Sequence, residues 1–210
     1  MQIIDKKGLL VRTKNPDKIT AYIQKSRVVG SPAEGMYDVL VYFNMVNARI
    51  LQNLGFKKTP APIEVDYGWP GMYKPFDHQK TTAAFLTMNQ RAFCFNEQGT
   101  GKTCSVAWAA DYLMHKKLVK RVLIICPLSI MSTEFVIINP DGVMSVRDEL
   151  AKGGFDMVVV DECTCLKNPS TLRWKAINSI IPHNGWLWML TGTPAAQSPV
   201  DAYGLAKIVN

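Results

Sequence analysis

A glycine-rich run, Gly99-Thr100-Gly101-Lys102-Thr103, is the strongest chemical signal in the chain. It follows an apolar stretch over residues 92–95 and precedes a helical pattern over residues 104–114. Glycines in such a place let the backbone curl, so that successive amide N–H groups and the start of the helix face bound phosphates. In a loop of this kind the lysine reaches the β and γ phosphates of a nucleotide, and the following hydroxyl ligates Mg²⁺. Lys102 and Thr103 are therefore predicted to bind nucleotide and metal.

Asn96 stands where the usual eight-residue phosphate-binding pattern begins with glycine. Asparagine enters the left-handed backbone region more readily than most residues. The exchange is therefore compatible with a phosphate-binding loop, which the strand-like and helical flanks also favour.

An acidic pair, Asp161-Glu162, ends the apolar run over residues 157–160. A strand ending in acidic residues is common, but a phosphate-binding loop upstream gives such a pair a specific use. We expect Asp161 to hold Mg²⁺ through water and Glu162 to orient or deprotonate an attacking water molecule.

The elements that must position these groups are short apolar runs separated by helical segments. Continuous apolar runs of this length are typical of a parallel sheet that is covered on both faces. The prediction is an α/β domain with a mostly parallel sheet, in which the loop and the acidic pair share one pocket. The predicted strands are residues 92–96, 121–126, 135–139, 157–161 and 186–191.

The connection over residues 127–134 is unusual, because it has only eight residues. A crossover between parallel strands usually needs about 10 to 12 residues or more, including a helix. Either the flanking strands are not parallel neighbours joined by a helix, or a helix-bearing segment is missing at this point.

Residues 1–60 predict a small N-terminal α/β unit, followed by a turn-rich linker over residues 61–72 and the nucleotide-binding domain over residues 73–210. Asn15-Pro16-Asp17 indicates a helix start, and residues 37–43 indicate a strand. A second helix is predicted between Asn44 and Gly55, with one apolar stripe made by Val46, Ile50, Leu51 and Leu54.

Five motifs follow one another along residues 73–205. They are Phe76-Asp77-His78-Gln79, the loop over residues 96–103, Cys126-Pro127-Leu128-Ser129, Asp161-Glu162-Cys163-Thr164 with Lys167-Asn168, and Leu190-Thr191-Gly192-Thr193-Pro194. In this order they resemble the first RecA-like domain of superfamily 2 helicases of the Swi/Snf type, with bacterial and phage relatives. The resemblance implies a RecA-like P-loop fold.

The resemblance also implies roles for individual residues. Gln79 would recognise the adenine of ATP, and Thr103 with Asp161 would hold Mg²⁺. ATP would also be contacted by Gln98, Gly99, Thr100, Gly101, Lys102 and Thr103, and catalysis would depend on Lys102, Asp161 and Glu162. Pro127 and Ser129 would contact the nucleic-acid backbone. Thr191, Gly192 and Thr193 would couple the state of the nucleotide to nucleic-acid binding.

Two departures from the family pattern affect these expectations. Cys163 and Thr164 replace an Ala-His pair, which puts in doubt a contact from that histidine to the coupling motif or to a partner domain. The family also has a longer stretch between the backbone-contact segment and the acidic pair. The short connection over residues 127–134 is then interpreted as the loss of a helix and of some nucleic-acid contacts.

The chain is predicted to be the ATP-binding N-terminal half of a DNA-dependent ATPase, helicase or translocase. It would use ATP and Mg²⁺ and act on nucleic acid, and double-stranded DNA is the expected form. Motors of this family need a second RecA-like domain, and only about 16 residues follow Pro194. Because arginines from that domain are worth about 10³ to 10⁵ in rate, we expect the chain alone to be weakly active or inactive. The alternative is a catalytically silent nucleic-acid or partner-binding module. A small-molecule P-loop kinase is less favoured, since the coupling motif has no role there.

Composition adds weaker constraints. The chain carries 24 basic and 17 acidic side chains, a net charge of +7, which suits an anionic partner but also an ordinary basic surface. No stretch approaches the about 18 apolar residues of a membrane span, and the start lacks the order of a signal peptide, so we expect a cytoplasmic protein.

Several residues with chemical potential are interpreted as structural. The five cysteines and three histidines lack zinc-site spacing, and the cysteines are expected to be reduced core residues. Tryptophans 174, 186 and 188 are expected to pack in the core. Lys116, Lys117, Lys120 and Arg121 are expected to form a solvated helix end.

Overall fold

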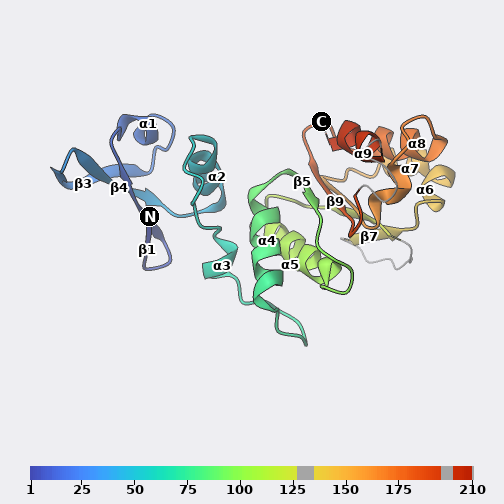
Figure 1. Cartoon of the computed structure of the whole chain (residues 1–210), viewed down its shortest axis with the longest axis horizontal. Helices are drawn as coiled ribbons and strands as arrows, with labels where there is room; N and C mark the ends of the chain where they lie inside the picture. The colour runs from blue at the N-terminus through green and yellow to red at the C-terminus, as the bar shows by residue number, and fades with distance from the viewer. Residues whose placement is uncertain (127–134, 195–200, 210) are drawn as a thin grey trace. The chain divides into compact units, whose positions relative to one another are not determined.

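The computed structural model describes residues 1–126, 135–194 and 201–209. The chain divides into two compact units, Met1–Trp69 and Pro70–Asn210, which are described separately (Figure 1). This division lies within the predicted linker. Among the described residues, no helix has both the length and the apolar character needed to cross a membrane.

The described part of unit 1 contains a four-stranded antiparallel sheet in the order β1-β2-β4-β3. Its strands are β1 (Gln2–Ile4), β2 (Gly8–Thr13), β3 (Ser26–Ala33) and β4 (Met36–Tyr42), and its helices are α1 (Asp17–Thr20), α2 (Met45–Asn53) and α3 (Ile63–Asp66). Every second residue of the two central strands is buried on one face, namely Leu9, Val11, Val39 and Val41.

The helix predicted after Asn44 is present, and of its predicted apolar stripe Leu51 is buried but Val46 is not. The Asn44 side chain accepts a hydrogen bond from the Asn47 amide at 2.8 Å and caps α2, as its position suggested. Val46 is 53% exposed, whereas the buried positions are Met45, Ala48 and Leu51. A row spaced by three residues therefore forms the buried side of the helix, and Val46 lies one position away from it.

Unit 2 contains a parallel sheet in the order β5-β9-β8-β6-β7. This confirms the predicted α/β class and mostly parallel sheet. The strands are β5 (Arg91–Cys94), β6 (Val122–Ile125), β7 (Phe135–Ile138), β8 (Met157–Val160) and β9 (Trp186–Leu190). The helices are α4 (Asp77–Met88), α5 (Lys102–His115), α6 (Gly142–Ser145), α7 (Arg147–Ala151), α8 (Leu172–Ile180) and α9 (Asp201–Val209), with a 3₁₀ turn, η1, at Cys163–Leu166.

Strands β6 and β7 are parallel neighbours, with Val122 opposite Phe135. The two predicted alternatives for these strands therefore differ only in the form of their connection. The eight residues that join them lie outside the described residues.

The sheet of unit 2 is covered on both faces. All four residues of β8 are buried, and successive strand residues point to opposite faces. Helices α4 and α5 lie on one side of the sheet, and α8 and α9 on the other (Figure 1). Val158 and Val160 pack into the cluster that includes Trp174 of α8 and Leu205 of α9. Double coverage explains why the strands are continuous apolar runs.

The three tryptophans predicted to be core residues are buried. Trp188 is fully buried, and its indole N–H donates to the Asn89 carbonyl at 3.0 Å. The Trp174 indole N–H donates to the Gly204 carbonyl at 2.9 Å. These hydrogen bonds satisfy the only polar atom of each buried ring, so both tryptophans are core residues with a fixed orientation.

Helix α9 packs against η1 through Gly204, and this contact generates a prediction. A Cβ atom at Gly204 would overlap the backbone carbonyl of Lys167, which cannot move as a flexible side chain can. We expect Gly204→Ala to lower the free energy of unfolding by about 1–3 kcal/mol in urea denaturation. Ala206→Ser, at an exposed position of the same helix, is the control and should be close to neutral. Equal stability of the two variants would contradict this packing.

Candidate nucleotide-binding site

The glycine-rich loop leads directly from β5 into α5. Gly99 has φ +77° and Gly101 has φ +73°, both in the left-handed region that favours glycine. Gly101 is the residue before the first residue of α5, Lys102. The two glycines therefore turn the chain so that the N-terminus of a 14-residue helix follows the loop at once.

Lys102 is held inside the loop. Its side chain is 7% exposed, and its ammonium donates to the Glu97 carbonyl at 3.0 Å. Among the described residues no carboxylate is paired with this ammonium. A buried cation bound only by a carbonyl is well suited to receive an anion such as a phosphate.

A hydrogen bond joins the loop to the acidic pair. The Thr103 hydroxyl donates to Asp161 Oδ2 at 2.9 Å, across 58 positions of sequence. The other oxygen of Asp161 accepts the backbone N–H of Glu162 at 2.9 Å. The Asp161 amide donates to the Ile125 carbonyl at 2.8 Å and so continues the ladder between β8 and β6. The two predicted site segments thus lie together at the carboxyl edge of the sheet.

Glu162 has φ 50°, in the left-handed region that a non-glycine residue rarely enters. It precedes η1, and the next residue, Cys163, is fully buried. A left-handed residue of this type costs about 1–2 kcal/mol, which the surrounding packing must offset. Such strain is frequent at functional sites, and it sets the direction in which the chain leaves the acidic pair.

Gln79 connects the start of α4 to the loop. Its amide nitrogen donates to the Thr100 carbonyl at 3.1 Å, and its amide oxygen accepts the Phe76 N–H at 3.0 Å. Both ends of the amide are therefore used, and its orientation is fixed by the backbone. A Cβ atom at Gly101 would overlap the Gln79 amide nitrogen, so this glycine is required both for its backbone angle and for close approach.

His78 and Phe76 lie beside Gln79 and were not predicted as site residues. His78 Nε2 lies 3.1 Å from the Thr100 carbonyl oxygen, and its ring stacks on Phe76 with an interplanar angle of 9°. The Phe76 side chain is 69% exposed. Their position next to Gln79 in the sequence was the one signal that could have identified them. The sequence analysis considered His78 only as a metal ligand, and its spacing does not favour that role.

The predicted coupling segment meets the loop. Thr191 is fully buried, its N–H donates to the Cys94 carbonyl at 3.1 Å, and its hydroxyl accepts the Thr193 N–H at 3.1 Å. A Cβ atom at Gly192 would lie 3.2 Å from Gln98 Cγ. The segment after β9 is therefore in contact with the loop after β5. Pro127 and Ser129, predicted to contact nucleic acid, lie outside the described residues.

Two cysteines near the site, Cys94 and Cys163, are buried in the core. Burial, with a smaller effect from neighbouring Cys165, raises the pKa of the Cys163 thiol to about 12. Burial also raises the pKa of Cys94, which ends β5. Both thiols are neutral near pH 7, so Cys163 occupies its place in the acidic motif as a small apolar side chain. Cys104 is exposed, so the prediction that the cysteines are core residues is wrong for this one.

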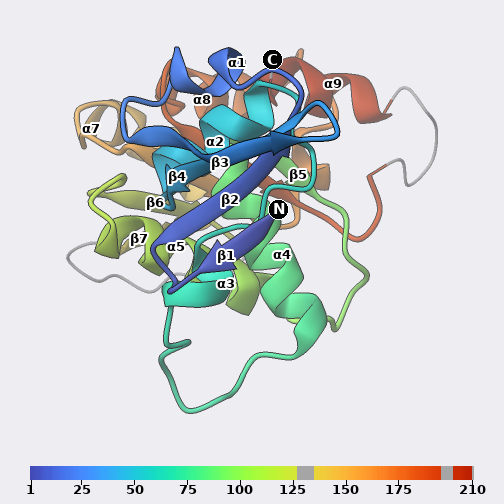
Figure 2. The ribbon, with the colours of Figure 1, turned by 90° about the vertical axis from the view of Figure 1, so that its left-hand side faces the viewer.

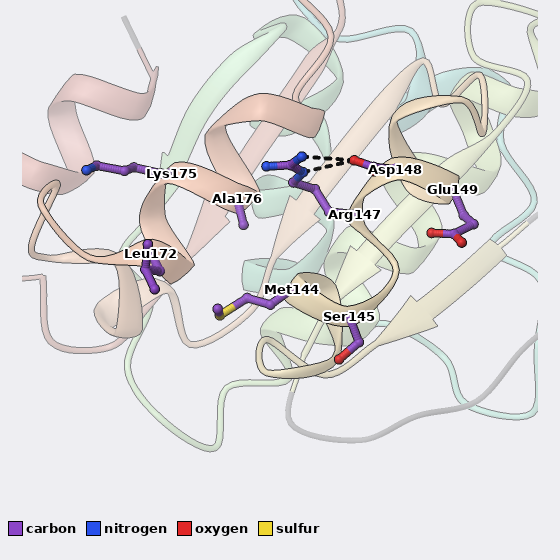
Figure 3. A pocket seen from close by; sticks show the side chains of 8 residues that line it. All are labelled: Met144, Ser145, Arg147, Asp148, Glu149, Leu172, Lys175 and Ala176. Atoms are coloured by element: carbon purple, nitrogen blue, oxygen red, sulfur yellow. Dashed lines mark hydrogen bonds and ion pairs between the residues drawn. The ribbon is translucent and has the colours of Figure 1, made fainter.

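A hollow of about 420 Å³ lies elsewhere in unit 2, between α6, α7 and α8 (Figure 3). Its lining includes the ion pair between Arg147 and Asp148 at 2.9 Å, together with Met144 and Leu172. None of its lining residues belongs to the loop or to the acidic pair. This hollow is therefore separate from the candidate site.

Comparison with known proteins supports the same fold. No family model and no curated protein matches the chain. Among solved structures, the chain is similar to the Sulfolobus solfataricus SWI2/SNF2 ATPase core in complex with dsDNA, with a TM-score of 0.56 and 17% identity. The chain therefore shares the fold of part of a SWI2/SNF2 ATPase core. The match covers 67% of this chain and 38% of that one, so the chain spans well under half the length of the structure it matches.

The two loop glycines allow a controlled test of the contact with Gln79. Gly99→Ala places a residue in the left-handed region with nothing within 4 Å of its Cβ, so only the backbone cost of about 1–2 kcal/mol is expected. Gly101→Ala carries the same backbone cost and also overlaps Gln79, so we expect it to lower the free energy of unfolding by about 1–3 kcal/mol more. Denaturant titration measures both values.

The double variant Gln79→Ala with Gly101→Ala removes the overlap. In the Gln79→Ala background, Gly101→Ala should therefore lower the free energy of unfolding by less than it does in the parent chain. A double-mutant cycle measures this difference. If Gly99→Ala and Gly101→Ala were equally destabilising, the amide would not be packed against the loop.

Proposed function

We propose that the chain is the ATP-binding half of a DNA-dependent ATPase of the translocase or helicase type. The observation that carries this proposal is the hydrogen bond of 2.9 Å between Thr103 and Asp161. It joins a hydroxyl at the start of a helix to a carboxylate at the end of a strand, the two protein groups from which a phosphate-bound Mg²⁺ is held in P-loop enzymes.

The residues present fit ATP with Mg²⁺. Lys102 would contact the phosphates, and the left-handed glycines leave the backbone amides of the loop and helix start facing them. Within the described residues, no three His, Cys, Asp or Glu side chains are grouped so that they could hold a metal ion. A site with one hydroxyl and one carboxylate suits Mg²⁺, which keeps several waters and is usually completed by substrate phosphates.

Gln79 would read the adenine edge, because its amide is already fixed by Thr100 and Phe76 beside the loop. The Phe76–His78 stack would offer an exposed apolar surface next to it. Glu162 would orient or deprotonate the attacking water. The bound Mg²⁺ would neutralise charge on the phosphates, and Asp161 would position it through its carboxylate.

Nucleic acid is the proposed partner, with double-stranded DNA its preferred form. The net charge of +7 favours an anionic partner, and the SWI2/SNF2 structure of similar fold contains dsDNA. Thr191, Gly192 and Thr193 would couple nucleotide state to the nucleic-acid surface, since they contact both β5 and the loop. Full turnover in motors of this type also needs arginines from a second RecA-like domain.

A catalytically silent binding module remains the second candidate. It is favoured by one observation, the fully buried Cys163 beside Thr164 in place of the Ala-His pair of the family. Duplex-stimulated hydrolysis of ATP by the 210-residue chain would exclude this candidate.

Lys102→Ala tests nucleotide binding. Because the ammonium makes charge-assisted contacts to phosphates, its removal should weaken ATP binding by roughly 100-fold, measured with a fluorescent ATP analogue and Mg²⁺. Lys175→Ala, at an exposed position of α8, should leave affinity unchanged. Unchanged affinity in Lys102→Ala as well would show that the loop does not bind phosphate.

Glu162→Gln tests the catalytic role separately from binding. The amide cannot accept a proton, so hydrolysis stimulated by duplex DNA should fall by about 10²- to 10⁴-fold while ATP affinity stays within a few-fold of the parent. A phosphate-release assay measures the rate. Loss of ATP binding in this variant, or an unaltered rate, would refute Glu162 as the base.

A further inference from the structure

The sheet of unit 1 has one face that is not filled by its core. Leu9, Val11, Val39 and Val41 point to the buried face, so the alternate residues of β2 and β4 point to the opposite one. Figure 2 looks onto strands β1 and β2 of this sheet. The register places Ile4 opposite Gly8, and Gly8 opposite Tyr42, in one row across three strands.

Gly8 produces a hollow in this row. It has no side chain, and it lies between Ile4, which is 38% exposed, and Tyr42, which is 46% exposed. The hollow has a volume of about 550 Å³ and is floored by apolar atoms that include Leu40. Its size is that of a small-molecule or nucleobase pocket rather than of a packing defect.

Three cations surround the hollow, and a single carboxylate, that of Asp5, lies among its lining residues. The Lys25 ammonium lies 5.6 Å from the centre of the Tyr42 ring. Within the described residues, the side chains of Lys7 and Arg27 take part in no hydrogen bond or ion pair. The nearby Arg12 differs, since its guanidinium is paired with Asp38 at 3.0 Å and is thereby neutralised.

We propose that this face, defined by Gly8, Tyr42, Lys7, Lys25 and Arg27, binds single-stranded nucleic acid. An unpaired base enters the hollow beside Tyr42, and the flanking phosphates contact the three cations. Half-exposed aromatic rings combined with cations on an open sheet are how many single-strand binding surfaces work. The inference rests on the proposed function, because it gives unit 1 a role on the same nucleic acid.

Single strands are favoured over a duplex by the hollow itself. Duplex phosphates could contact Lys7, Lys25 and Arg27, but duplex bases are stacked and paired and could not enter a pocket beside Tyr42. A protein partner is less favoured, because Lys7 and Arg27 lack a carboxylate partner among the described residues and a strand of phosphates offers an anion to each of them. Charge complementarity and the hollow together therefore select an unpaired strand.

The test uses the full 210-residue chain without nucleotide, and fluorescence anisotropy with labelled oligothymidylate of about 16 nucleotides and the matching duplex. Tyr42→Leu should weaken single-strand binding by about 5- to 150-fold, the range found for loss of one base-stacking contact. Lys25→Ala with Arg27→Ala should also weaken it and should reduce the slope of log affinity against log salt by about 1.4, which corresponds to two phosphate contacts.

Gly8→Val places a side chain in the hollow and narrows it without changing any charge. Gly8 has no positive φ, and the new side chain would first meet the flexible end of Leu40 at 3.1 Å, so the fold should persist, as thermal unfolding would verify. We expect single-strand affinity to fall at least 5-fold while duplex affinity stays unchanged. Lys14→Ala with Lys18→Ala removes two exposed positive charges that do not line the hollow and should have little effect.

The outcomes separate this inference from the proposed function. Absence of single-strand binding, or equal losses for duplex and single strand in Gly8→Val and Tyr42→Leu, would overturn it. The inference would also be overturned if single-strand affinity fell as much in the Lys14→Ala, Lys18→Ala control as in the Lys25→Ala, Arg27→Ala variant. Net positive charge alone would then account for the binding. ATP binding measured on the same samples reports on unit 2 independently. If the chain bound single strands but not ATP, the proposed function would be wrong and this inference would still hold.

Discussion

The hydrogen bond between the Thr103 hydroxyl and the Asp161 carboxylate is the contact on which the candidate site depends. It can form only because the loop after β5 and the end of β8 reach the same edge of the sheet, with β9 between the two strands. In a parallel sheet all carboxyl ends meet at one edge, so residues far apart in sequence become neighbours there. All residues of β8 and β9 are buried, so the packing of these strands determines how close the end of β8 lies to the loop after β5.

A second constraint acts on the loop, because the Gly101 backbone and the Gln79 side chain lie very close to each other. Gly101 must be left-handed, and it must also leave room for the Gln79 amide, which spans from Thr100 to Phe76. The loop, the start of α4 and the segment after β9 are thus linked without any charged pair. Thr100 connects the loop to Gln79, and Cys94 and Gln98 connect β5 and the loop to the segment after β9.

Unit 1 follows a different physical rule. Its antiparallel sheet buries one face and leaves the other open, as antiparallel sheets can because their residues alternate strictly between faces. On the open face, Gly8 has no side chain and so leaves a hollow, and the side chains of Lys7, Lys25 and Arg27 line it. Unit 2 therefore supplies a candidate nucleotide site made of backbone amides and two oxygen ligands, whereas unit 1 supplies a surface made of side chains.

Much of this organisation was determined by the sequence alone. The five strands of unit 2, the glycine loop before α5 and the acidic pair after β8 were all predicted, because continuous apolar runs and glycine spacing are local signals. Tertiary structure decided the rest. The strand order, the pairing of β6 with β7, the burial of Met45 in place of Val46, and the contact of Gln79 with the loop depend on partners distant in sequence. The open face of unit 1 could not be predicted either, because Gly8 and Tyr42 become neighbours only through the register of two strands.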